Sequence, residues 1–290
     1  MKKWNASGTI RTVFDLEPVS RYRLERPPLV KAVGQTRYPI VARLQTLDGI
    51  ASVQEALTPL FPYMQQQQQQ RLSLIVGPGS QPMSGGQITN SWVFTDDAGW
   101  SVKVAPDAAT LEVGPQYGSF EEFEERFRAV LTALRETGAV QRCDRLGLRY
   151  VDVAEVPPED EAAWRGWFRS ELTGWIASDL VSESTRVDTS IAQTQLAASP
   201  TGHLAGPPVD VQAVIRHGYV PQSAVLPGVL PVPMERPAFL IDVDLFVDGH
   251  QAFDQIELTR QLGLFHDQID RFFRWCLSPV GENYFGLEEL

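Results

Sequence analysis

The stretch that decides the fold is residues 91–156, SWVFTDDAGWSVKVAPDAATLEVGPQYGSFEEFEERFRAVLTALRETGAVQRCDRLGLRYVDVAEV. Its first part predicts a β-hairpin, because Asp96–Gly99 has the residues of a tight turn and residues 100–105 alternate between apolar and polar or small. A short strand is expected at 110–113 and a long one at 141–156. Together with the helix between them, these strands predict an antiparallel sheet with an amphipathic helix packed across it.

That helix has a signal at each end. Ser119 and Glu122 have the spacing of a capping box, in which each side chain accepts a hydrogen bond from the backbone amide of the other residue. Gly138 can adopt the left-handed conformation that ends many helices. Between them, apolar residues recur with the period of one helix face: Phe120, Phe123, Phe127, Val130, Leu131 and Leu134.

Signals for strands and helices continue on both sides of this stretch. Strands are expected at 29–40, 72–76, 181–195, 209–220 and 238–247, and an edge strand at 8–16. Helices are expected after Asp48, which would cap the first of them, at 159–178, and after Asp254, which forms a second capping box with Glu257. The glutamine run 65–70 is interpreted as either the polar tail of the first helix or the lead into strand 72–76.

The order of these elements occurs twice along the chain. A strand, a helix, antiparallel strands and a long capped helix follow one another in residues 29–137 and again in 142–277. We infer an α+β protein with two similar lobes, each an antiparallel sheet with helices packed on one face. The expected domains are residues 1–156, which include an N-terminal arm, and residues 157–290.

Composition excludes several classes of protein. The 290 residues carry a net charge of −11, which argues against broad binding to nucleic acid. No apolar run approaches 18 residues, so no membrane span is expected, and no apolar segment follows the basic start of the chain, so no secretory signal is expected. Cys143 and Cys276 are too few for a disulfide framework. These features together predict a cytoplasmic protein.

Sequence motifs for catalysis or cofactors are missing. The histidines lack the spacing of a helical metal pair, and there is no Cys-x-x-Cys motif, nucleophile elbow or dinucleotide fingerprint. We therefore assign no catalytic residue, no metal ligand and no cofactor. His266 is expected to be a partly buried histidine with a nearby hydrogen-bond partner.

Charged residues are expected to meet on the second sheet. Asp242 and Asp244 are two apart on one strand, so both carboxylates point to the same face. Arg186 and Asp188 share a face of the strand at 181–195, and Arg216 adds a cation. Paired carboxylates can bind Mg²⁺ or act as acid and base, but such a face is more often the solvent side of an antiparallel sheet.

Two arginines at similar places in the two lobes form another candidate site. Arg37 and Arg149 each lie in the leading strand of a lobe and precede a tyrosine. Because their positions in the two lobes are equivalent, they could converge on a central anionic ligand. Residues 145–153 are expected to form a central strand, on which Arg149 lies on an otherwise small and apolar face. A buried, unpaired arginine is costly, so Arg149 should meet a carboxylate or carbonyl cluster, or else line a cleft.

Three tryptophans lie on the helix expected at 159–178. Trp164, Trp167 and Trp175 fit one broad helix face, which favours a role in the core. If part of that face is exposed, the tryptophans are candidates for a surface that binds a protein partner.

Several motifs together resemble a sporadically distributed bacterial family of uncharacterised proteins of about this length. They are Leu29–Val33 with Arg37-Tyr38-Pro39, the Trp100 hairpin, the helix with Phe120, Phe123 and Phe127, the strand Arg145–Tyr150 and the helix with Leu264-Phe265-His266. The resemblance covers nearly the whole chain and supplies no catalytic residues. The patchy distribution of the family implies accessory, mobile or defence-linked genes.

Two functions remain open from the sequence. The first is a bacterial accessory protein that binds a protein partner, immunity-like or antitoxin-like, without catalysis of its own. The second is a small-ligand-binding protein or enzyme, with a site for an anionic ligand or a metal-assisted site between the lobes. A homodimer is compatible with either function.

Overall fold

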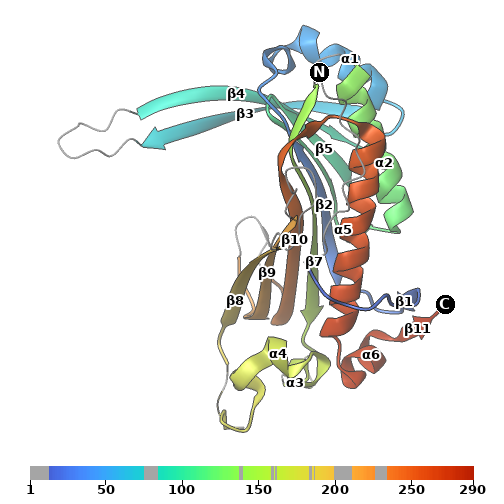
Figure 1. The fold of residues 1–290 in the computed structure, drawn as a ribbon. Coiled ribbons are helices and arrows are strands. Elements are labelled where there is room, and N and C mark those ends of the chain that lie inside the picture. Colours follow the sequence, from blue (N-terminus) through green and yellow to red (C-terminus); the bar gives the residue numbers. More distant parts are fainter. Residues whose placement is uncertain are drawn as a thin grey trace. The chain divides into compact units, whose positions relative to one another are not determined.

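The computed structural model describes residues 13–74, 84–136, 140–157, 160, 162–182, 185, 187–198, 211–225 and 234–290. These residues form an α+β fold with antiparallel sheets, as expected (Figure 1). Two compact units are present: one comprises Met1–Ala32, Gly147–Asp248 and Gly263–Leu290, and the other Val33–Leu146 and Gly249–Leu262. We call them unit 1 and unit 2. The expected lobes were continuous segments, whereas each unit combines separate ones.

The main sheet has nine strands in the order β3-β4-β5-β6-β2-β7-β10-β9-β8. Their bounds are β2 Leu29–Arg37, β3 Tyr63–Leu74, β4 Ser84–Thr95, β5 Trp100–Ala105, β6 Ala108–Val113, β7 Arg142–Glu155, β8 Ser190–Ala197, β9 Val211–Val220 and β10 Ala238–Ala252. The interior position of β7 confirms that residues 145–153 belong to a central strand. A second, two-stranded sheet pairs β1 (Tyr22–Leu24) with β11 (Leu287–Glu289).

Unit 2 is built around the hairpin and helix that decide the fold. Trp92 lies opposite Val104 in the β4–β5 pair, and the Asp96 carboxylate accepts hydrogen bonds from two backbone amides of the turn. Helix α2 (Phe120–Glu136) begins where Ser119 accepts a hydrogen bond from the amide of Glu122. The hairpin and the start of the helix are confirmed, because the signals that carry them are local. Of the predicted capping box the Ser119 half is present, while the Glu122 carboxylate accepts hydrogen bonds from Arg126.

Helix α2 lies close against strand β2. A Cβ atom at Gly34 would come within 3.0 Å of the Phe127 ring and 3.1 Å of the Phe123 ring. A side chain at this position would require the two rings to move by a few tenths of an ångström, so glycine permits the close approach of the helix to the sheet.

Helix α1 (Leu47–Leu57) begins two residues earlier than a cap at Asp48 would place it. Thr46, and not Asp48, is the N-cap, since the Thr46 hydroxyl accepts a hydrogen bond from the amide of Gly49. Asp48 lies in the first helical turn, where its charge is favourable beside the helix dipole. The correction moves the start of the helix without changing its buried face.

The described residues between 159 and 178 do not form the single helix expected. Three short turns replace it: α3 (Trp164–Trp167), α4 (Ser170–Thr173) and the 3-10 helix η2 (Gly174–Ala177). The chain is extended at Phe168, which forms an isolated bridge with Leu277, and Gly174 has a positive φ of 59°. Pairing with a distant segment therefore interrupts a pattern whose periodicity is helical.

The last third of the chain contains two further corrections. Helix α5 (Gln255–Cys276) is capped by Asp254 as expected, but Pro279 begins helix α6 (Pro279–Phe285) and does not merely end α5. Ser278 caps α6. Strand β8 begins at Ser190, so the part of the expected strand before it is not a strand in the residues that the structure describes.

The edge strand expected at 8–16 is not found where the structure can test it. Residues 8–12 lie outside the described residues, and residues 13–16 are not a strand.

Both cysteines are buried thiols. Burial raises the pKa of Cys143 to about 11 and that of Cys276 well above its usual value. We expect both thiols to resist a thiol reagent in the native protein at pH 8 and to react after unfolding in guanidinium, as a colorimetric thiol titration would measure. Fast labelling of one thiol under native conditions would contradict the buried position of that residue.

Candidate functional site

One face of unit 1 brings charged side chains together across neighbouring strands. The register places Asp242 of β10 opposite Arg216 of β9, and Arg216 opposite Gln193 of β8. Directly opposite residues of antiparallel strands share a face, so these three side chains form a row. Arg149 of β7 joins the row through its contact with Asp242. We call Arg149, Asp242, Arg216 and Gln193 the charged row.

Asp242 is the centre of the charged row. Its side chain is fully buried, and it accepts hydrogen bonds from Arg149 Nε at 2.6 Å and from Arg149 Nη2 at 2.8 Å. Arg216 Nη1 donates to the same carboxylate at 2.9 Å, and Arg216 Nε donates to Gln193 Oε1 at 2.8 Å. The prediction that Arg149 meets a carboxylate is therefore confirmed, with the bidentate geometry that favours arginine.

Both arginines of the row reach solvent. Two guanidinium groups surround one carboxylate, and the arginine side chains remain 21% and 31% exposed for Arg149 and Arg216. Beyond Arg149 the same face is apolar: Val151, Val153, Val220, Ala238 and Leu240 form a buried cluster. The row thus runs from the buried apolar patch to the exposed strand β8, and its hydrogen bonds position Arg149 and Arg216.

The opposite face of β7 carries a second polar group. Tyr150 Oη lies 3.0 Å from His266 Nδ1 of α5, which confirms the expected hydrogen-bonded environment of His266. Nearby, Tyr22 donates a hydrogen bond to Asp270 at 2.8 Å. Burial, followed by the charges of Asp242 and Asp270, raises the pKa of Asp152 to about 8. Asp152 is therefore a buried acid that holds its proton at neutral pH, which residue spacing alone did not indicate.

The remaining candidates occupy positions other than those of the charged row. Asp244 is half-buried on the same face as Asp242, and its carboxylate is close to Gly147. Asp188 precedes β8, so it does not share a strand face with the row. Arg186 lies outside the described residues, and Arg37 is the exposed last residue of β2, in unit 2.

The three tryptophans have different environments. Trp164 and Trp167 are each 2% exposed; Trp164 stacks on Phe239, and Trp167 stacks on Tyr284. These two are core residues and not surface candidates. Trp175 in η2 is 68% exposed. Of the predicted partner surface, only Trp175 is available to a partner.

No family model matches this chain, and no curated protein matches it either.

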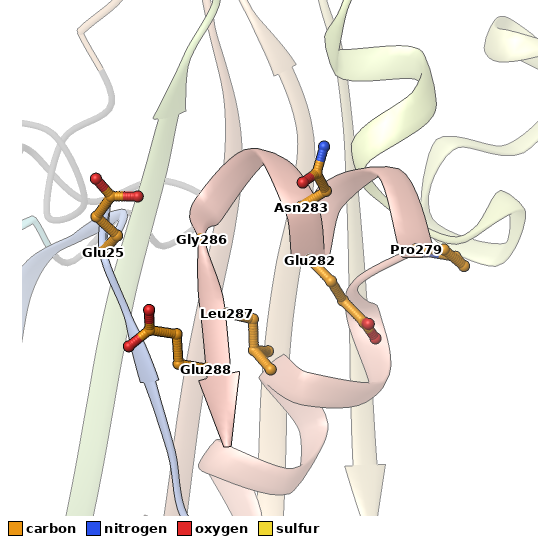
Figure 2. Close-up of a pocket in the computed structure, with 7 residues that line it drawn as sticks. All are labelled: Glu25, Pro279, Glu282, Asn283, Gly286, Leu287 and Glu288. Atoms are coloured by element: carbon orange, nitrogen blue, oxygen red, sulfur yellow. The ribbon is translucent and has the colours of Figure 1, made fainter. Parts of the chain in front are cut away.

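An open depression of 390 Å³ lies at the β1–β11 end of unit 1 (Figure 2). Glu25, Glu282 and Glu288 contribute carboxylates to its lining. Figure 2 shows that the Glu282 side chain points away from Glu25 and Glu288, and Glu282 pairs with Arg274. Within the described residues, no group of three or more potential ligands could hold a metal ion. The carboxylates do not converge, so this depression is not a metal centre.

Among the residues that the structure describes, no helix has both the length and the apolar character to cross a bilayer.

Proposed function

We propose that the protein is a bacterial accessory protein that binds a protein partner, immunity-like or antitoxin-like, without catalysis of its own. The observation that carries the proposal is the outer edge of β8. Six of the eight β8 residues are exposed, and β8 pairs with β9 only, as far as the described residues extend. An open edge of this kind can accept a strand from another protein through main-chain hydrogen bonds.

The side chains of β8 suit this role. Natural edge strands usually carry charged residues or proline, which prevent pairing with another strand. The strand SIAQTQLA has neither. Ile191 is 44% exposed and offers an apolar contact on the face that also carries Gln193. A partner strand on this edge would lie directly beyond the charged row.

An exposed aromatic side chain follows a helix that packs against the neighbour of β8. Helix α4 packs against β9, and Trp175 lies in η2, the turn that follows α4. Tryptophan is enriched at the centres of protein interfaces, where burying it contributes much of the binding energy. We therefore include Trp175 in the proposed partner surface.

The order of strands also supports an internal duplication, which belongs to the proposal. In the first half, β2 lies beside β6, the last strand of that half; in the second half, β7 lies beside β10 in the same way. β2 and β7 are neighbours at the middle of the sheet. From them the strand order is β2-β6-β5-β4-β3 on one side and β7-β10-β9-β8 on the other, so in both halves the first strand is followed by the last. A duplicated ancestor within the sporadically distributed family is the simplest origin of this arrangement.

The test is capture of a partner by the tagged full chain from its native host, with crosslinking. We expect one protein to be captured, and we expect Ile191→Lys/Gln195→Lys to abolish capture, because charges on an edge strand oppose pairing. Trp175→Ala should weaken binding by about tenfold or more. Ile256→Ala is the matched control, since Ile256 is 75% exposed on α5. A chain that always elutes alone would contradict the proposal.

A second candidate is a binding site for an anionic small ligand at the charged row. Two partly exposed guanidinium groups on one face are the observation that favours it. A thermal-shift panel of phosphates, nucleotides and dicarboxylates, with and without Mg²⁺, tests this function. A ligand that binds only the native state must raise the melting temperature, and Arg216→Ala should remove that rise.

A further inference from the structure

Strands β3 and β4 continue as a pair beyond the rest of the sheet (Figure 1). They pair along their whole length, from Tyr63 opposite Thr95 to Leu74 opposite Ser84, whereas β4 pairs with β5 only through Trp92–Thr95. Residues 67–74 and 84–91 therefore form a two-stranded ribbon, which we call the arm. In the part of the chain that the structure describes, no third strand pairs with the arm.

The arm differs in charge from the rest of the molecule. The chain has 36 acidic and 25 basic residues, but β3 and β4 contain no Asp or Glu. Arg71 is their one charged residue. Four consecutive glutamines of β3, residues 65–68, are exposed. A molecule that contacts the protein along β3 therefore meets no carboxylate from β3 or β4.

The outer edge of β3 is chemically open. It has no lysine, proline or acidic residue along its length, although natural edge strands usually carry such residues to prevent pairing. A two-stranded ribbon is also marginally stable in water without a further strand or a packed face. Both facts indicate that β3 gains a neighbour in the working form of the protein.

We propose that this neighbour is β3 of a second copy of the chain. Two identical antiparallel edges related by a two-fold axis place the glutamine run of one copy opposite the glutamine run of the other. A glutamine amide both donates and accepts hydrogen bonds, so the run is complementary to itself. Two molecules of net charge −11 repel each other, and the acid-free edge is where they approach at the least electrostatic cost.

This self-association goes beyond the proposed partner binding, which uses β8. The pairing adds main-chain hydrogen bonds but little apolar area, so we expect a weak, concentration-dependent dimer. In an antiparallel pair centred on Gln67 or Gln68, residues 66 and 68 face glutamines of the other copy. Substitutions at these two exposed positions therefore report directly on the contact.

The experiment is sedimentation velocity on the full chain and on two charged variants. Wild type should form a dimer, while Gln66→Lys/Gln68→Lys and Gln66→Glu/Gln68→Glu should each raise the dimer dissociation constant by about tenfold or more, because like charges meet at the axis. An equal mixture of the Lys and Glu variants should restore dimers that contain one copy of each. Ser52→Lys/Ala56→Lys, on the exposed face of α1, adds the same charge and should dimerise as wild type does.

Several outcomes would overturn the proposal. They are a monomeric wild type at every soluble concentration, equal dimerisation of wild type and the Lys variant, and a Lys and Glu mixture that stays monomeric. Circular dichroism melting of each variant verifies that it is folded. Loss of dimerisation with intact capture at β8 would leave the proposed partner binding standing, so the two ideas fail separately.

Discussion

Arg149→Ala is expected to lower the free energy of unfolding by roughly 3 kcal/mol, the lower end of the range for breaking a buried ion pair. The substitution removes both hydrogen bonds from Arg149 to the fully buried Asp242. Arg216 still donates to the same carboxylate, which keeps the loss at this end of the range. Urea unfolding followed by far-UV circular dichroism measures the change.

Two comparisons give this prediction its control. Arg260 pairs with Glu257 on α5, and its side chain is 50% exposed, so Arg260→Ala should cost about 1 kcal/mol or less. A double-mutant cycle between Arg149→Ala and Asp242→Asn should show a coupling of about 1–3 kcal/mol, since the two residues share one network. An Arg149→Ala variant as stable as wild type would show that the charged row does not stabilise unit 1.

Local signals in the sequence predicted much of the fold. The hairpin around Asp96–Gly99, helix α2 and strand β7 appear where periodicity, turn residues and capping indicated them. Each of these signals lies within one element and its ends. The pairing preference of Arg149 was also predictable, because a guanidinium on a small, apolar strand face requires a partner.

The identity of that partner was not predictable in the same way. Asp242 was named as a candidate, but as one of a carboxylate pair with Asp244, and its contact with Arg149 joins residues 93 apart in the chain. Which residues of two strands lie opposite each other depends on register, which the hydrophobic pattern and turn geometry set. Strands β7 and β10 are far apart in the chain, so no tight turn between them indicates their register.

Nonlocal packing also explains two segments whose structure the sequence left open or predicted wrongly. The glutamine run has no alternation between apolar and polar residues, yet it forms part of β3 because β4 pairs with it residue by residue. The segment with three tryptophans has helical periodicity, but the bridge from Phe168 to Leu277 interrupts the helix. In both places a distant segment decides the local conformation, which propensity alone cannot show.

Asp152→Asn is expected to stabilise the protein at alkaline pH and to flatten its stability between pH 4 and pH 8. Burial, then the carboxylates of Asp242 and Asp270, raises the pKa of Asp152 from 3.8 to about 8 in the folded state. The native state therefore binds a proton that the unfolded state has released over this range. Wild-type stability falls as pH rises through it and levels off above the folded pKa.

The asparagine amide has nearly the shape of a protonated aspartic acid, but it does not lose a proton between pH 4 and pH 9. The gain at pH 9 is on the order of 5 kcal/mol at most, because one pKa unit corresponds to about 1.4 kcal/mol, and it vanishes near pH 4, where both states of wild type hold the proton. Thermal melting from pH 4 to pH 9 measures both limits. Asp179→Asn, the same change at an exposed position, should leave the pH profile as in wild type. Parallel pH profiles for Asp152→Asn and wild type would contradict a buried, protonated Asp152, since the slope that the substitution should remove would still be present.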